Sequence, residues 1–158
     1  MSPFEALQLP NGQVLPNRIA KAAMEENMAD GNQAPSRELK QLYKAWADGK
    51  PGVLITGNVM VDRRAMTGPG GVALEDEQHL ASFREWADVA RGNGVHFWVQ
   101  LSHPGRQTPA NLRQQALAPS AVALRGISDP ATVQFTPLIC AAIACAAAFA
   151  VTPSEAAM

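Results

Sequence analysis

Polar and basic side chains that could bind a small molecule follow an apolar segment near the middle of the chain. Residues 95–101 read VHFWVQL and residues 102–107 read SHPGRQ, which places Gln100 at the end of a predicted strand. A side-chain amide can donate and accept hydrogen bonds at once. Because catalytic and cofactor-binding residues gather at the carboxyl ends of parallel strands, Gln100 is a candidate site residue.

The elements around Gln100 predict a parallel α/β fold. Residues 52–61 contain the apolar run VLIT and are predicted to form a strand. A helix is predicted from about Asp76 to Arg91, where glycines end it. Together with the strand at 95–101 these segments form a β-α-β unit, which is the repeat of parallel α/β folds.

The region before this unit is predicted to contain a hairpin, a strand and a helix. Asn11 and Gly12 separate short apolar segments and can supply the positive φ angles of a tight β-turn. Residues 19–24 form an apolar run that we interpret as the first buried strand. A helix is expected between Ser36, a typical N-cap, and Gly49, a typical terminator. Its buried face repeats at helical spacing through Leu39, Leu42, Tyr43 and Trp46.

The remaining segments read as loops or as core. Residues 62–76 and 102–137 are rich in Gly, Pro and polar residues, which favours long surface excursions. The cluster of Asp62, Arg63 and Arg64 is typical of a solvated loop. Core packing is expected for Trp46, Trp86 and Trp98. The His103–Arg106 turn is compatible with a turn-forming role or with ligand contact, and the sequence leaves both open.

Composition limits the classes of function. The chain has 158 residues, 47% of them hydrophobic, which is enough for one domain but short of the roughly 250 residues of a whole eight-fold barrel. A net charge of −1 disfavours nucleic acid as a partner and attachment to anionic membrane. The N-terminal residues do not follow a secretory pattern, which favours a cytoplasmic setting. No residues are spaced as metal ligands, and Cys140 and Cys145 are poorly placed for a disulfide.

The C-terminal residues differ in composition from the rest. Residues 138–151 form a run of fourteen apolar residues rich in alanine. As a helix this run would span about 21 Å, short of a hydrocarbon core of roughly 30 Å, so a membrane anchor is not expected. We therefore divide the chain into residues 1–137, a folded α/β part, and residues 138–158, an apolar tail.

Three segments in order carry a family resemblance. The segments RIAKAAMEENMAD, GVLITGNVMVD and HFWVQLSHPGRQ resemble the old yellow enzyme family of FMN-dependent oxidoreductases. The resemblance implies the N-terminal part of a (β/α)8 TIM barrel that is incomplete in residues 1–137 and preceded by the hairpin. It also implies FMN at the barrel mouth, NAD(P)H as hydride donor, and an activated alkene or related small molecule as acceptor.

The resemblance also implies which residues bind the cofactor. Ala23 and Met24 match positions that pack on the isoalloxazine and offer backbone groups to its polar edge. Glu25 matches a position that tunes the flavin, and a carboxylate there is expected to lower the flavin potential. Asn58 matches a position beside the flavin, and Gln100 matches an amide that bonds its pyrimidine ring.

Other family features have no counterpart in this sequence. The family's substrate-binding His/His or His/Asn pair, its tyrosine proton donor and its FMN phosphate site come from later strands, so no catalytic residue is assigned. Tyr43, the only tyrosine, is expected in the core.

Three interpretations therefore stay open. The chain is a catalytically incomplete FMN-dependent NAD(P)H oxidoreductase, a flavin-binding half that needs a complementary chain, or a non-catalytic truncated or frameshifted fragment that leaves the family pattern after Pro137. Because barrel edges are left unpaired, the chain by itself is expected to be poorly stable, prone to self-association or dependent on another chain.

Overall fold

The computed structural model describes residues 1–112, 116–122 and 133–135, so the predicted tail and both cysteines lie outside the described residues. The chain divides into two compact units. The first unit comprises Met1–Val59, Gly70–Val72 and Asp76–Gln100, and the second comprises Met60–Pro69, Ala73–Glu75 and the described residues from Leu101 onward.

The N-terminal hairpin is confirmed. Strands β1 (Leu7–Gln8) and β2 (Val14–Leu15) pair antiparallel, with Leu7 opposite Leu15. Only Gly12 of the predicted Asn-Gly pair has a positive φ, of 86°. Asn11 contributes differently, because its side-chain oxygen accepts a hydrogen bond of 3.1 Å from the amide of Gln13.

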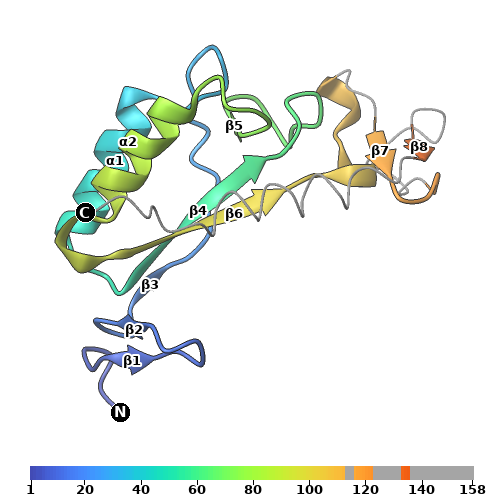
Figure 1. Ribbon diagram of the computed structural model, residues 1–158. Coiled ribbons are helices and arrows are strands. Elements are labelled where there is room, and N and C mark those ends of the chain that lie inside the picture. The colour runs from blue at the N-terminus through green and yellow to red at the C-terminus, as the bar shows by residue number, and fades with distance from the viewer. Residues whose placement is uncertain (113–115, 123–132, 136–158) are drawn as a thin grey trace. The chain divides into compact units, whose positions relative to one another are not determined.

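A mostly parallel sheet follows, as predicted. Strand β3 (Ala20–Lys21) pairs in parallel with β4 (Val53–Met60), and β5 (Val72–Ala73) and β6 (His96–Ser102) join the same sheet. Strands β4 and β6 lie side by side and run in the same direction (Figure 1). A backbone hydrogen bond of 3.1 Å, from the His96 amide to the Gly52 carbonyl, joins the two segments where the strands begin. This arrangement confirms the β-α-β unit.

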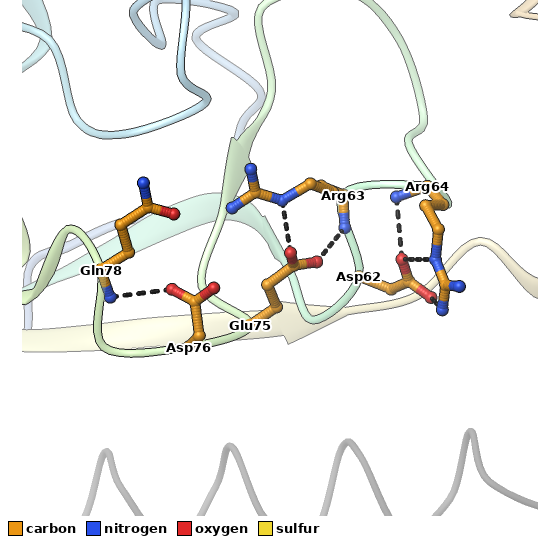
Figure 2. Close-up of polar contacts among 6 residues, drawn as sticks. All are labelled: Asp62, Arg63, Arg64, Glu75, Asp76 and Gln78. Carbon is orange, nitrogen blue, oxygen red and sulfur yellow. Dashed lines mark hydrogen bonds and ion pairs between the residues drawn. The ribbon is translucent and has the colours of Figure 1, made fainter.

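The two helices of the first unit pack against one face of this sheet. Helix α1 (Arg37–Asp48) begins where predicted, since the Ser36 hydroxyl accepts a 3.0 Å bond from the Leu39 amide. Helix α2 (Leu80–Ala90) begins later than the predicted Asp76. The carboxylate of Asp76 instead accepts from the Gln78 amide at 2.8 Å, a local turn that competes with a helical start (Figure 2).

Aromatic rings form the centre of the first unit. The Tyr43 ring of α1 meets the Trp86 ring of α2 at 5.0 Å and the Phe97 ring of β6 at 5.8 Å, both edge to face. Tyr43 and Trp86 are buried, at 0% and 2% exposure. Core roles predicted for these residues are confirmed, and the contacts show that the helices cover the Phe97 face of β6.

Several predicted boundaries were wrong. The first strand spans only Ala20–Lys21 instead of residues 19–24, and the predicted loop at 62–76 contains β5. The excursion after β6 contains 3-10 turns and strands β7 (Ala116–Ala118) and β8 (Val133–Phe135), which pair in parallel. Strands of two or three residues are too short to show a period in sequence, so tertiary pairing decides them.

The second unit has a small apolar core. Met60, Met66 and Ala73 are buried together, and Leu112 packs against them. These residues hold the long connection after β4 in place within that unit.

Candidate functional site

The segment that leaves β3 passes closely over β4 because β4 contains a glycine. A Cβ atom on Gly57 would lie 2.2 Å from the Met24 carbonyl oxygen and 2.8 Å from a Glu26 carboxylate oxygen. No side chain fits in that space, so Gly57 permits the crossing. The crossing brings Ala23, Met24 and Glu25 to the carboxyl half of β4, where the candidate site lies.

Three predicted site residues form a hydrogen-bonded row in the first unit, which we call the amide row. The side-chain NH2 group of Asn58 donates to a carboxylate oxygen of Glu25. The side-chain NH2 group of Gln100 donates to Asn58 Oδ1 at 2.6 Å. The row thus joins the segment after β3 to β4 and β6, and both Glu25 and Gln100 are exposed.

A buried threonine fixes the backbone under the row. Thr56 has no exposed surface, and its hydroxyl accepts a 2.9 Å bond from the backbone amide of Gln100. The same hydroxyl donates to the Gly57 carbonyl at 2.7 Å. Thr56 therefore couples β6 to β4 at Gln100, near the carboxyl end of β6.

Large apolar side chains are exposed around the same elements. Met24 is 53% exposed and Trp98 is 40% exposed. The core role predicted for Trp98 was wrong. Side chains alternate along a strand, so Phe97 faces the helices while Trp98 and Gln100 share the opposite face of β6. An exposed apolar ring and an exposed amide on one face are the groups that a flat, partly polar ligand needs.

A second polar network lies beneath the helices and uses the residue next to Glu25. Lys21 Nζ donates to Glu26 at 2.7 Å, and the Tyr43 hydroxyl donates to the same carboxylate oxygen at 2.9 Å. Lys21 also donates to the Ile55 carbonyl at 2.9 Å, and its charge lies 4.7 Å from the centre of the Trp46 ring. We call Lys21, Glu26 and Tyr43 the buried network.

Burial dominates the chemistry of this network. The side chains of Lys21 and Glu26 are only 9% and 10% exposed. Burial, assisted by the negative charge of Glu26, raises the pKa of Tyr43 far above its ordinary value. Tyr43 thus stays protonated and donates, which makes it a structural residue, in agreement with its predicted core position.

The charged cluster after β4 belongs to the second unit and is held by ion pairs (Figure 2). Asp62 accepts from the Arg64 backbone amide at 2.8 Å and from its guanidinium at 3.0 and 2.9 Å. These bonds hold the pKa of Asp62 below its usual value. Arg63 donates from its backbone and its guanidinium to Glu75. The predicted loop is therefore held by hydrogen bonds and ion pairs between its own charged residues.

The His103–Arg106 turn has an internal role in the second unit. His103 Nδ1 accepts a 3.0 Å bond from the Gly105 amide, and burial lowers the pKa of the imidazole. Gly105 has a φ of 57°, which a glycine adopts without strain. Arg106 is exposed. The geometry favours the turn-forming interpretation for His103.

The structure thus brings Glu25, Asn58 and Gln100 into contact and places Ala23 and Met24 in the adjoining segment. The sequence did not indicate Thr56, Gly57 or the buried network. A glycine inside an otherwise apolar strand was the available signal, since it often marks a close backbone approach. Among the described residues, no group of His, Cys, Asp or Glu is gathered to hold a metal ion. In that same part of the chain, no helix has the length and apolar character needed to cross a membrane.

Comparison with known proteins points to one family. Residues 3–143 match the NADH:flavin oxidoreductase / NADH oxidase family. The NADH-dependent flavin oxidoreductase iliE of a Neonectria species is 39% identical over 128 residues, which is 75% of this chain and 17% of that protein. Across the first curated relatives the chain spans between 17% and 27% of their length.

Solved structures show the same fold. The old yellow enzyme homologue from Zymomonas mobilis superposes with a TM-score of 0.72 at 19% identity, over 87% of this chain and 40% of that one. Morphinone reductase in complex with tetrahydroNAD superposes with a TM-score of 0.68 at 24% identity, over 80% of this chain and 35% of that one. The fold is therefore part of an old yellow enzyme TIM barrel, as the sequence predicted.

Proposed function

The chain belongs to the NADH:flavin oxidoreductase / NADH oxidase family, and on this basis we propose that it supplies one wall of the FMN site of an NAD(P)H-dependent oxidoreductase. The amide row is the observation that carries the proposal. It presents the exposed side-chain amide of Gln100 near the carboxyl end of β6, beside the segment that contains Ala23, Met24 and Glu25.

The chemistry of these groups fits FMN. The isoalloxazine is a flat ring system with apolar faces and one edge of alternating carbonyl and N–H groups. The exposed side chains of Met24 and Trp98 offer apolar contact area, and the Gln100 amide can bond the polar edge. In this proposal Ala23, Met24, Glu25, Asn58 and Gln100 hold the cofactor.

When bound, FMN would supply hydride transfer from NAD(P)H to an activated alkene or related small molecule. The residues of this chain would bind and orient the ring and exclude water from one of its sides. The carboxylate of Glu25 would disfavour extra negative charge on the ring and so lower its reduction potential. We also propose that NAD(P)H is the hydride donor and that the protein works in the cytoplasm.

Flavin titration tests the proposal directly. We expect the 158-residue chain to quench the fluorescence of added FMN and to carry a flavin spectrum through gel filtration. Gln100→Leu should weaken this binding about tenfold, because it removes the amide that would bond the polar edge of the ring. Gln41→Leu, on the exposed side of α1, is the matched control and should bind FMN like the parent chain. Absence of any flavin from the purified and reloaded chain would contradict the proposal.

A second candidate is a flavin-binding half that works with a complementary chain. The observation that favours it is the pairing of β6, which within the described residues bonds only to β4. A free strand edge can bond another strand, of a partner or of a second copy. Analytical ultracentrifugation of the chain should then show association. A monomer with one cooperative unfolding transition would contradict this candidate.

A further inference from the structure

We propose that Glu25 is a positioning residue that acts through Asn58 to fix the side-chain amide of Gln100 in one orientation. In this orientation Gln100 selects ligands with an imide or lactam edge, where an N–H group adjoins a carbonyl. The inference rests on the proposed flavin site and deepens it, since it names the feature of the ring that is recognised.

The direction of the amide row follows from donor and acceptor chemistry. An ionised carboxylate only accepts hydrogen bonds, whereas a primary amide has a donor end and an acceptor end. The end of Asn58 that faces Glu25 must therefore be its NH2 group. Its carbonyl oxygen, Oδ1, consequently faces Gln100, and it can bond only the NH2 group of that residue.

The consequence for Gln100 is a defined set of remaining groups. One N–H of its side chain is used on Asn58, at 2.6 Å, and its backbone amide is held by Thr56 at 2.9 Å. Within the described part of the chain, its carbonyl oxygen, Oε1, and its second N–H have no hydrogen-bond partner and can serve a ligand. An acceptor beside a donor complements a ligand edge that has a donor beside an acceptor.

Glu25 is needed because an amide has nearly the same shape in both orientations. Without a carboxylate at one end, Asn58 can turn its oxygen toward residue 25 and its NH2 group toward Gln100. Gln100 would then have to turn its own oxygen toward Asn58, leaving only N–H groups for a ligand. A ligand edge with an N–H donor would lose its acceptor.

The first arm of the experiment examines the chain without ligand. Side-chain amide signals of Asn58 and Gln100 are measured by 15N NMR in the parent chain, in Glu25→Gln and in Glu77→Gln. Glu77 is an exposed residue outside the amide row and serves as a control of equal charge change. We expect Glu25→Gln to shift both side-chain signals and Glu77→Gln to shift neither. An unchanged Gln100 side-chain signal in Glu25→Gln overturns the inference.

The second arm compares FMN with 3-methyl-FMN, in which a methyl group replaces the ring N–H. The parent chain and Glu77→Gln should bind FMN about tenfold more tightly, since the methyl group leaves the Gln100 oxygen unpaired. In Glu25→Gln the preference should fall to about threefold or less. Equal binding of the two flavins by the parent chain overturns the inference. If neither flavin binds, the proposed flavin site fails and with it the imide preference, whereas the NMR signals still decide the orientation of the row.

Discussion

Glu25 and Glu26 are adjacent in the sequence yet belong to networks of opposite character. Glu26 is nearly buried and is bonded by Lys21 and Tyr43 beneath the helices. Glu25 is exposed and is bonded by Asn58 on the other side of the crossing segment. The environment therefore determines the role of each residue. The buried, paired carboxylate of Glu26 stabilises the fold, whereas the exposed carboxylate of Glu25 can orient the groups of a binding site.

Removal of the Lys21 charge from the buried network should have the largest effect on stability. Lys21→Ala leaves the Glu26 carboxylate buried without its counter-charge, which typically costs about 3–5 kcal/mol. Urea unfolding should show this loss. Lys44→Ala is the control, because Lys44 forms an ion pair with Asp48 in which the two side chains are 61% and 55% exposed. That pair should contribute less than about 1 kcal/mol. Similar losses in both variants would refute the structural role of the buried network.

A change at the close approach between Gly57 and the segment that carries the two carboxylates should have the next largest effect on stability. In Gly57→Ala the new methyl group meets the Met24 carbonyl at 2.2 Å, so the segment must shift. We expect a loss of about 1–3 kcal/mol in unfolding free energy and weaker FMN binding. Gly68→Ala, where no atom lies within 4 Å of the added carbon, should be nearly neutral. A fully stable Gly57→Ala protein would show that the close approach is not required.

High pH offers a test of the buried network alone. Because the pKa of Tyr43 is raised by burial, the folded chain keeps this phenol proton above pH 10, where the unfolded chain loses it. Its stabilising contribution is therefore complete below about pH 10 and declines as pH rises further. The parent chain should lose up to about 1.4 kcal/mol per pH unit more than Tyr43→Phe between pH 10 and 11.5. Parallel pH profiles of the two proteins would argue against a buried, protonated Tyr43.

The smallest effect on stability should come from the amide row. Glu25→Gln keeps the shape of an exposed side chain, so its unfolding free energy should stay within about 0.5 kcal/mol of the parent. The flavin preference should nevertheless change. A loss larger than about 1 kcal/mol would place Glu25 with Glu26 as a structural residue and remove the distinction between the two networks.

Local signals in the sequence were sufficient for some elements. Helix α1 was predicted with its ends because Ser36 and Gly49 act on their own neighbours and because Leu39 and Tyr43 repeat with the helical period. Strands β4 and β6 were long enough for their apolar character to show. The β-α-β order then placed Gln100 at a strand end, and the family resemblance added Glu25 and Asn58.

Other features depended on contacts between distant segments. The predicted strand at residues 19–24 ends at Lys21, because the chain then turns to cross Gly57. Trp98 was predicted in the core, yet only the position of the helices determines which face of β6 is covered. Tyr43 was correctly placed in the core, but its bond to Glu26 could not be foreseen from their separation in sequence.

The sequence by itself determined the longer helices and strands, the family and the residue types at the candidate site. Only the tertiary structure decided that Glu25 meets Asn58 and Gln100 while Glu26 meets Lys21 and Tyr43. The physical reason is that propensity, capping and periodicity act within a few residues, whereas the partner of a side chain depends on which strands pair and where a glycine lets the backbone pass.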